Sequence, residues 1–425
     1  MNNDALENQI KPNRLDHYHQ NAALISLILL PLPGLPSQVG LALVFVFLLR
    51  IPTTFKSVCT LLKMPIFLLF ICWWLFAAIS YSWASVTTHS LLASPLLLFV
   101  IPSLYPALKQ HRKFILAIGI GAVIHTTIQA VCWLGVVEDI RYTPMSKSGG
   151  LHWYPPFTAL WATCAFMLLL GLILNADTWK NRLAPLLIAI PLPLSLVLAG
   201  TRVLYIIIPF VIIFLMIKLL CISTNRIQRK NVIIVCIGIA IIEVGSLLVP
   251  WTSPNQNMSN LVNEISTSTG NSGVEESDQF VNSIGMRYLW WKSGFQIWKK
   301  APWAGHGNGT SKYQYAIQEA EMPTKYGADV AGFIIADPHS SILATAMEQG
   351  LIGVILLVSF TLLAFSRAWK YATAKSSLVG LSACWLTIIG FSFVHTIQFS
   401  GYVSTLVVIL ATFTLCMTKE EKSLL

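Results

Sequence analysis

Charged residues are scarce in this sequence, whereas hydrophobic residues make up more than half of it. Of its 425 residues, 11% are Asp, Glu, Lys or Arg and 55% are hydrophobic. A water-soluble core cannot bury so much apolar surface, so the composition excludes an ordinary soluble protein and indicates a lipid environment. The hydrophobic residues form runs near residues 21–33, 36–49, 66–81, 91–107, 114–134, 156–175, 184–199, 203–221, 232–250, 342–366, 376–394 and 401–417. These runs predict an all-α membrane helix bundle with about twelve transmembrane helices.

Basic residues are nearly absent from the short connections on one side of the predicted bundle. The short connections on that side contain only Arg141, Lys147 and Arg202, whereas the other connections and both termini contain most of the 28 basic residues. The positive-inside rule therefore places both termini in the cytoplasm. The excess of basic over acidic residues, 28 to 18, then reflects membrane topology and does not indicate a nucleic-acid partner. Because the first run lacks a small-residue cleavage site, we expect it to be retained as a membrane helix.

Several motifs that bind metals or nucleotides are missing. None of the eight cysteines forms a CxxC pair, and no Asp-x-Asp motif lies in an outer connection. We therefore expect no disulfide framework, no metal site and no cofactor. Gly305, Gly307 and Gly309 resemble a phosphate-binding loop, but no Lys-Ser or Lys-Thr follows them, which excludes a P-loop. We expect these glycines to form a tight turn that lets the backbone approach a helix or a ligand closely.

One connection is far longer than the others and divides the chain into three parts. We expect residues 1–250 to form transmembrane helices 1–9, residues 251–341 to form a large helical loop on the outer side, and residues 342–425 to form transmembrane helices 10–12. Loops of this length are uncommon unless they have a function. Residues 252–279 are rich in Asn, Ser, Thr and Gly, which is typical of a flexible segment.

The second half of this loop has helical periodicity. Aromatic and other large residues recur every three or four positions from Ser283 to Lys300, and Pro302 is expected to end this helix. A second helix is predicted over residues 310–320. A third is expected to begin at Pro338 and to continue into the next transmembrane span.

Two arginines in outer connections are candidate ligands for an anion. Arg202 lies in a short turn between two apolar runs, and Arg287 lies near the start of the tryptophan-rich helix. Guanidinium groups bind phosphate through two parallel hydrogen bonds and remain charged at any working pH. Each arginine also has a simpler interpretation. Arg202 would anchor a helix end at the membrane interface, and Arg287 would pair with Glu275, Glu276 or Asp278.

His339 is the candidate general base, because the unperturbed pKa of an imidazole lies near neutrality. It lies where the long loop re-enters the membrane, although a lone histidine in such a place is more often a hydrogen-bonded structural residue. His306, within the glycine turn, is the reserve candidate. Glu348 follows His339 by nine residues, which puts the two out of phase on a continuous helix. We therefore expect Glu348 to make interhelical hydrogen bonds.

The aromatic and basic residues of the loop helix provide secondary candidates. Trp291 and the neighbouring tryptophans are expected to form an interfacial belt, or alternatively to stack against sugar rings. In the second case, Lys299 and Lys300 would lie near anionic lipid or phosphate groups.

The order of these residues resembles the O-antigen ligase and polymerase superfamily. The resemblance rests on Gly200-Thr201-Arg202 at a span boundary and on Arg287 opening a helix that is followed by Pro-Trp-Ala-Gly-His-Gly. It also rests on a His-Ser-Ser sequence at His339 and a Glu-Gln-Gly-Leu-Ile-Gly sequence at Glu348. It covers residues 195–360, and upstream spans match only in being hydrophobic.

This resemblance implies a metal-independent glycosyltransferase of the membrane GT-C type in the bacterial inner membrane. Such an enzyme, an O-antigen ligase, transfers O-polysaccharide from undecaprenyl pyrophosphate to lipid A-core on the periplasmic face, with inversion of configuration. Carried over to this chain, Arg202 and Arg287 would bind the donor pyrophosphate, and His339 would deprotonate the acceptor hydroxyl. The implied partners are the lipid-linked glycan donor, the lipid A-core acceptor and membrane lipids.

Two groups of alternatives remain. An O-antigen polymerase or a protein O-oligosaccharyltransferase would share the same residues and topology and differ in its acceptor. A transporter or lipid flippase would also fit a bundle of this size, but the predicted spans contain few ionisable residues and no internal repeat is visible.

Overall fold

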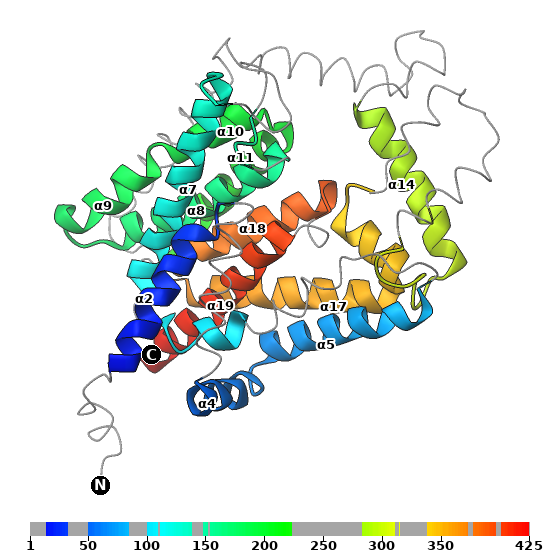
Figure 1. Ribbon diagram of the computed structural model, residues 1–425, viewed down its shortest axis with the longest axis horizontal. Helices are drawn as coiled ribbons and strands as arrows, with labels where there is room; N and C mark the ends of the chain where they lie inside the picture. Colours follow the sequence, from blue (N-terminus) through cyan, green and yellow to red (C-terminus); the bar gives the residue numbers. More distant parts are fainter. Residues whose placement is uncertain are drawn as a thin grey trace.

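The chain folds into a bundle of α-helices. The computed structural model describes residues 14–32, 50–84, 100–108, 111–137, 148–151, 154–222, 283–310, 314, 338–372, 377–396 and 401–424. Within these ranges the elements are α-helices and a short 3-10 helix at Tyr81–Trp83, with no strand (Figure 1). Six helical stretches of the described chain are long and apolar enough to cross a membrane. The all-α fold class predicted for a polytopic membrane protein is therefore confirmed.

Most helices overlap the predicted apolar runs, but α4 lies in a predicted connection and α2 begins before its run. The N-terminal part contains α2 (Arg14–Leu29), α4 (Ile51–Leu61), α5 (Pro65–Ser80), α7 (His111–Trp133), α8 (Pro155–Asn175), α9 (Trp179–Ala189), α10 (Leu192–Ala199) and α11 (Arg202–Ile222). The loop helix α14 (Ser283–Lys300) precedes α17 (Ser341–Tyr371), α18 (Leu378–Val394) and α19 (Gly401–Leu424). Proline in the first turn, where its missing N–H costs nothing, begins α4, α5 and α8. The spans predicted at residues 36–49 and 232–250, the first part of the span at 91–107 and the helix predicted at 310–320 lie outside the described residues, apart from residue 314.

The run predicted as one span over residues 184–199 contains a break. α9 begins earlier, after Thr178, whose hydroxyl oxygen accepts a hydrogen bond from the Asn181 amide at 3.4 Å. Ile190 and Pro191 then separate α9 from α10. Proline interrupts a helix because it lacks an N–H and its ring crowds the preceding turn. The combined stretch Trp179–Ala199 still has the length of a membrane span.

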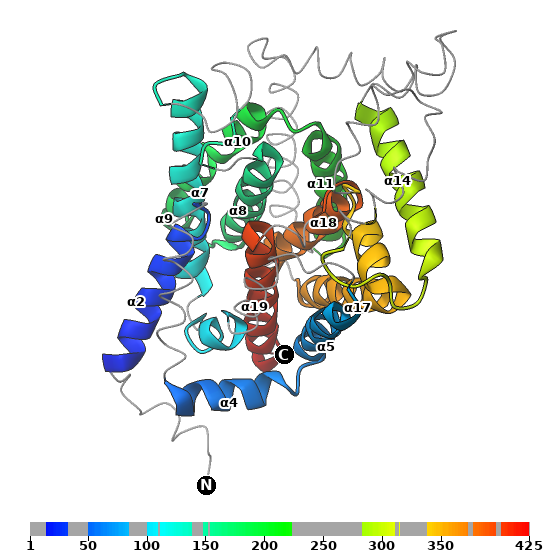
Figure 2. The same cartoon turned by 45° about the vertical axis from the view of Figure 1, so that its right-hand side comes forward.

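α8 is the central helix of the bundle. It contacts α7, α9, α10, α18 and α19 (Figure 2), and most of its side chains are buried. Glycines allow α8 and α18 to approach closely, because a Cβ atom on Gly380 would collide with the Met167 carbonyl oxygen. Trp385 of α18 donates its indole N–H to the Thr414 hydroxyl of α19 at 2.9 Å. Helices in lipid associate through close packing at small residues and through interhelical hydrogen bonds, because the burial of apolar surface offers little driving force there.

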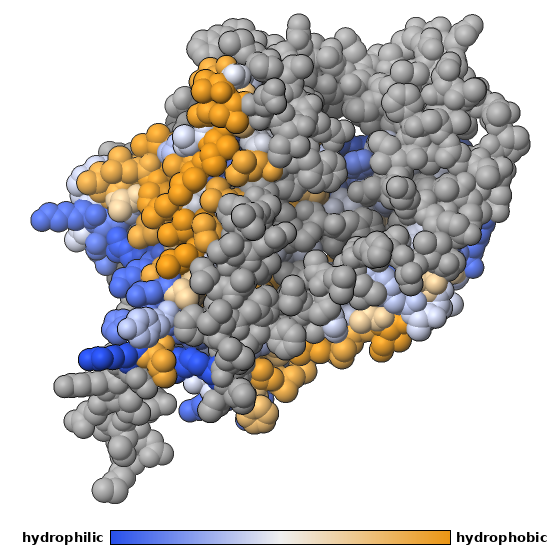
Figure 3. All heavy atoms as spheres, viewed as in Figure 1, coloured by the Kyte–Doolittle hydropathy of each residue, from blue (hydrophilic) through white to orange (hydrophobic). Residues whose placement is uncertain are grey.

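The outer surface of the bundle is apolar over its helices. α5 exposes Leu68, Leu75 and Ile79, and orange side chains line the lower edge of the molecule where this helix lies (Figure 3). α9 exposes Leu187, and the break after it exposes Ile190. Exposed leucine and isoleucine side chains on helices of this length are the surface expected to face lipid.

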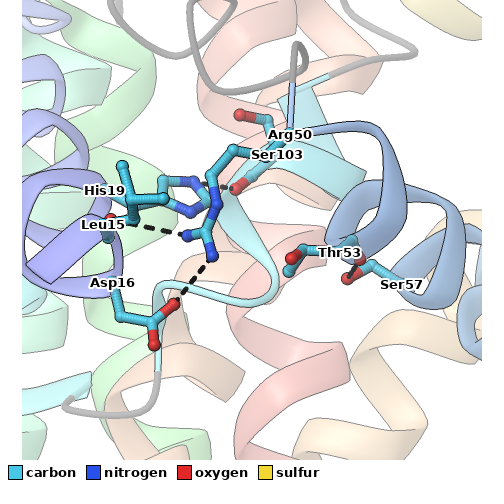
Figure 4. A network of polar contacts seen from close by, with 7 residues as sticks. All are labelled: Leu15, Asp16, His19, Arg50, Thr53, Ser57 and Ser103. Carbon is cyan, nitrogen blue, oxygen red and sulfur yellow. Dashed lines mark hydrogen bonds and ion pairs between the residues drawn. The ribbon is translucent and has the colours of Figure 1, made fainter. Parts of the chain in front are cut away.

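A small polar network ties α2 to the start of α4 (Figure 4). The Arg50 guanidinium donates to the Asp16 carboxylate at 3.0 Å and to the Leu15 carbonyl oxygen at 3.4 Å. His19 Nε2 lies 2.9 Å from the Ser103 carbonyl oxygen, within hydrogen-bonding distance. This network lies at the end of the bundle that the charge distribution predicts to be cytoplasmic.

α17 is broken at Gly350, and a turn that follows α14 fills the break. Gly350 has φ 63° and ψ −163°, a conformation that is accessible in practice only to glycine. The backbone groups freed by the break form four hydrogen bonds: Leu351 N–H to Pro302 O at 2.8 Å, Ile352 N–H to Trp303 O at 3.2 Å, His306 N–H to Met347 O at 2.9 Å and Gly307 N–H to Glu348 O at 2.9 Å. Irregular backbone in an apolar helix requires such internal partners.

The glycine turn makes this contact possible. A Cβ atom on Gly305 would collide with the backbone of Glu348, and one on Gly307 would lie 2.5 Å from the Cα atom of Ala84. The Asn308 amide also donates to the Ser80 hydroxyl at the end of α5 at 3.1 Å. The prediction that these glycines allow close approach to a helix is confirmed. The turn fastens the C-terminal end of α14 to α17.

Candidate active site

α14 buries one face against α17 and exposes the other. Trp290, Gly294 and Ile297 recur with helical spacing and are buried, and Ile297 packs against Met347 of α17. Trp291, Lys292, Phe295, Lys299 and Lys300 are exposed. The helix predicted from Ser283 to Lys300 is therefore confirmed at both ends, and it lies beside the start of α17 at the right of Figure 1.

His339 lies just before α17 in a strained conformation. Its φ is 48°, and it is the only residue other than glycine with a positive φ in the described part of the chain. Ser340 caps α17 by accepting a hydrogen bond from the Leu343 amide at 3.4 Å. The left-handed region costs a non-glycine residue about 1–2 kcal/mol, so the surroundings must hold it there.

This geometry corrects one prediction. α17 begins at Ser341 and not at Pro338, because the left-handed backbone of His339 cannot belong to a right-handed helix. The argument that His339 and Glu348 lie out of phase on a continuous helix therefore does not apply, since only Glu348 is in the helix.

Two consecutive tryptophans of α14 hold the His339 segment. The Trp290 ring lies 4.7 Å from the His339 ring, centroid to centroid, at an interplanar angle of 31°. The indole N–H of Trp291 donates to the Pro338 carbonyl oxygen at 3.0 Å. Trp291 thus contacts the segment that contains His339, which the sequence did not indicate. The half-buried His339 remains partly accessible to solvent.

A second histidine, His395, completes a cluster with Arg287 and His339. Its ring is buried and lies 5.9 Å from the His339 ring in a T-shaped arrangement. Burial lowers the pKa of His395 well below its ordinary value, and the positive charges of Arg287 and His339 lower it further. Arg287 and His339, which are distant in sequence, therefore both lie near enough to His395 to affect its pKa electrostatically.

Arg202 opens α11 directly after a tight turn. Gly200 ends α10 in the left-handed conformation, with φ 58°, and Thr201 is buried. The predicted turn between two apolar helices is therefore confirmed. The side chain of Arg202 lies outside the described residues, so its place beside Arg287 remains a prediction.

A buried polar cluster joins this turn to the connection before α8. The Ser148 amide donates to the Leu198 carbonyl oxygen at 2.9 Å, and the Gln129 side-chain amide donates to the Ser148 carbonyl oxygen. The Ser195 hydroxyl donates to Gln129 Oε1 at 2.7 Å. Buried polar groups with such partners hold a connection in one conformation. Residues 148–151 are therefore fixed next to the Arg202 turn.

His306 and Glu348 lie at the junction of α14 and α17. His306 Nε2 is 2.9 Å from the Ile297 carbonyl oxygen, and the buried Glu348 accepts the Gly307 amide through its backbone. These contacts join the glycine turn to α14 and to α17, and the interhelical hydrogen bonds expected of the Glu348 side chain remain a prediction. The reserve assignment of His306 as the base gains no support from this arrangement.

Lys299 and Lys300 end α14 on its exposed side. Lys299 Nζ lies 4.8 Å from the centroid of the Phe295 ring, a cation–π contact. Cations in the last turn also stabilise a helix through its dipole. Their predicted contact with anionic lipid or phosphate remains untested.

Tyr154 and His395 are the site residues that sequence reasoning missed. The Tyr154 hydroxyl lies 3.0 Å from His395 Nδ1. Tyr154 directly precedes the predicted span at 156–175, and His395 directly follows the one at 376–394. A polar side chain at the outer end of a span was the available signal. The structure thus brings together residues from several connections that the charge distribution places on the outer side.

No metal-binding group is visible in the described ranges. Within them, no three His, Cys, Asp or Glu side chains lie close enough together to hold a metal ion. The prediction that the reaction needs no metal remains a prediction.

Fold and site together define a polytopic α-helical membrane protein in which two histidines lie next to each other at the ends of apolar helices, beside the helix that carries Arg287. Residues 186–358 match the family model described as O-antigen ligase, and this match confirms the predicted resemblance to the O-antigen ligase and polymerase superfamily. The matched range contains Arg202, Arg287 and His339. It indicates a membrane glycosyltransferase of the O-antigen ligase or polymerase type. A comparison with curated proteins found no match.

Proposed function

We propose that this protein is an O-antigen ligase, which transfers O-polysaccharide from undecaprenyl pyrophosphate to lipid A-core at the periplasmic face of the inner membrane. The observation that carries the proposal is that His339 lies between His395 and the tryptophans of α14, the helix that also carries Arg287. Arg287 and His339 lie within the residues that match the O-antigen ligase model.

In the proposed reaction, His339 acts as the general base. A hydroxyl of the acceptor sugar attacks the anomeric carbon of the donor from the side opposite the pyrophosphate, and His339 takes the hydroxyl proton. The bond between the anomeric carbon and the pyrophosphate oxygen breaks, and its electron pair leaves with undecaprenyl pyrophosphate. The configuration at the anomeric carbon is therefore inverted. A base held rigidly by Trp290 and by the Trp291 contact to Pro338 suits this role.

Arg287 and Arg202 bind the pyrophosphate in this mechanism. The leaving group gains negative charge as the glycosidic bond breaks, and fixed guanidinium groups stabilise that charge more than they stabilise the ground state. Arg287 comes from the long loop and Arg202 from the turn between α10 and α11. Binding the pyrophosphate would therefore also join the loop to the bundle.

Reconstitution with purified substrates tests the assignment. The protein is placed in liposomes with a lipid-linked glycan donor and a lipid A-core acceptor, without divalent metal, and product is measured on gels. We expect His339→Ala to lower turnover by about 10²–10⁴-fold, the usual contribution of a general base. We expect Arg287→Ala to lower it by about 10²–10³-fold.

Two matched variants control for general damage. His17→Ala removes an exposed histidine from α2, and Lys292→Ala removes an exposed cation from the same helix as Arg287. Both should retain wild-type turnover. Unaltered turnover in His339→Ala would contradict the base assignment, and complete loss of wild-type activity on addition of EDTA would contradict a metal-independent reaction.

The phenotype of a deletion strain separates the ligase from its alternatives. Loss of all O-chain together with accumulation of the lipid-linked polymer supports the ligase. Core capped with a single repeat indicates the polymerase, and normal lipopolysaccharide with unglycosylated protein indicates a protein O-oligosaccharyltransferase. Transport of a lipid-linked glycan without any transfer product would indicate the flippase.

A further inference from the structure

His395 contacts the His339 segment through both its side chain and its backbone. The imidazole ring lies 5.9 Å from that of His339 at an interplanar angle of 79°. The His395 carbonyl oxygen accepts the Ser341 amide at 3.2 Å and the Ser341 hydroxyl at 2.9 Å. The end of α18 therefore holds the start of α17 two residues after His339.

The orientation of the His395 ring is fixed from two sides. The ring stacks on Phe391, one turn earlier in α18, with centroids 4.4 Å apart. Its Nδ1 lies 3.0 Å from the Tyr154 hydroxyl, and the two rings meet edge to face. With His395 only 2% exposed, this hydrogen bond is sheltered from competition with water.

Tyr154 is itself held by its surroundings. Its ring packs edge-on against Phe157, with centroids 4.7 Å apart. The Thr158 hydroxyl donates to the Gly149 carbonyl oxygen at 3.1 Å, which holds residues 148–151 against the first turn of α8. The Ser148 amide bonds the Leu198 carbonyl oxygen in the same region. The chain of contacts thus runs from the turn before Arg202 to His339.

We propose that Tyr154 and His395 form a positioning pair that fixes the orientation of the His339 side chain and backbone for proton transfer. The assignment of His339 as the base rests on the proposed function, but the positioning itself does not. A pair of this kind explains how a non-glycine residue is kept in the left-handed region at the site. It also explains why a buried histidine contacts a half-buried tyrosine at the end of an apolar helix.

The charge state of His395 follows from its neighbours. The titratable and charged groups that face it in the described chain are Arg287 from α14, His339 from the segment before α17, and Tyr154 from the connection before α8. A proton on His395 would be buried and would lie near the Arg287 guanidinium, and both effects lower the pKa of His395. The imidazole therefore works in its neutral form, in which one ring nitrogen accepts and the other donates a hydrogen bond.

The first experiment needs no glycan substrate. Diethylpyrocarbonate acylates neutral, accessible imidazoles, and the rate at His339 is measured by peptide mass spectrometry for wild type, Tyr154→Phe and His395→Phe. We expect the rate at His339 to change by about fivefold or more in either variant, the equilibrium effect of one lost hydrogen bond. Tyr18→Phe, an exposed tyrosine of α2, should leave it unchanged. An unchanged rate in both Tyr154→Phe and His395→Phe, with intact folding, would overturn the proposal.

The second experiment uses transfer activity and its pH profile. Tyr154→Phe and His395→Phe should lower kcat by about 10–100-fold with little change in donor KM, as expected for a misplaced base. His395→Gln, whose amide can replace the contact to Tyr154, should recover part of that loss. In the wild-type protein, protonation of His395 at acid pH should make the decrease of kcat/KM steeper than protonation of His339 alone would make it. This additional decrease should be absent in His395→Gln. Equal losses in the Gln and Phe variants with an unchanged pH profile would show a merely structural role.

The two experiments distinguish two failures. If the wild-type protein transfers no glycan but the acylation rate at His339 depends on Tyr154 and His395, the proposed function is wrong and the positioning pair stands. If transfer depends on His339 but neither measurement responds to Tyr154 or His395, the pair is wrong and the proposed function stands.

Discussion

Replacing Gly350 by alanine tests whether the break in α17 holds the loop helix in place. Gly350 has a backbone conformation that alanine adopts only with strain, and a Cβ atom there would collide with the Trp303 carbonyl group. Trp303 belongs to the turn that fastens α14 to α17. The substitution must therefore either straighten α17 or push the turn away.

The expected cost follows from the contacts at the break. Strain in this region contributes about 1–3 kcal/mol. The turn makes four backbone hydrogen bonds to α17, each worth about 0.5–1.5 kcal/mol. If two of them are lost, the free energy of unfolding falls by about 2–6 kcal/mol in total. Because α14 carries Arg287 and the two tryptophans that hold His339, glycan transfer should fall as well.

Hydrogen exchange measured by mass spectrometry on the detergent-solubilised protein resolves the effect. The amides of His306 and Gly307, which donate to the carbonyl oxygens of Met347 and Glu348, should exchange faster in Gly350→Ala. Gly390→Ala is the matched control, because its Cβ would meet only the Ile207 side chain at 3.2 Å in a helix with ordinary φ. Exchange of the turn no faster than in this control would refute the reasoning.

Three further predictions concern single contacts. Trp291→Phe removes the hydrogen bond to the Pro338 carbonyl oxygen and should lower the initial rate of transfer by about 2–10-fold, at an unchanged folded fraction. Because the pKa of His395 in the folded protein lies below its ordinary value of 6.5, the unfolded chain binds a proton more readily below that pH. The free energy of unfolding should thus fall as the pH drops below 6.5 toward the lowered pKa, and denaturant titrations of His395→Gln should show a flatter dependence. Asp16→Asn breaks the partly exposed ion pair with Arg50 and should change the melting temperature little, since such pairs contribute about 0–1 kcal/mol; a large shift would contradict this.

The helices and the predicted membrane topology follow from local sequence properties. Apolar runs of sufficient length, ended by proline, glycine or charged residues, predict spans because lipid offers no hydrogen-bond partners to an irregular backbone. The helix from Ser283 to Lys300 was predictable in the same way, from its periodicity and from Pro302 beyond it. Arg202, Arg287 and His339 were recognisable because ionisable residues stand out in a chain of this composition.

The arrangement of the site depends on contacts between distant segments, which local patterns do not encode. His395 directly follows an apolar run, so the sequence indicates only an ordinary interfacial residue. The packing of α18 against α8 and α17 nevertheless buries it beside His339. Tyr154 acquires its role only through the hydrogen bond to His395. The break in α17 also depends on a distant segment. From its sequence alone, Gly350 could lie in a straight helix. The helix breaks there because the carbonyl oxygens of Pro302 and Trp303 accept the amides of Leu351 and Ile352.

The sequence by itself therefore determined the lipid environment, the all-α class, the loop helix and the three candidate residues of the site. These properties depend on composition and on spacing along the chain. Only the tertiary structure decided that His339 lies outside the helix in a left-handed conformation, that Trp290 and Trp291 hold it, and that His395 lies beside it. The physical reason is that strain, burial and a shared electrostatic environment arise from groups brought together by packing, and packing joins residues that are far apart in sequence.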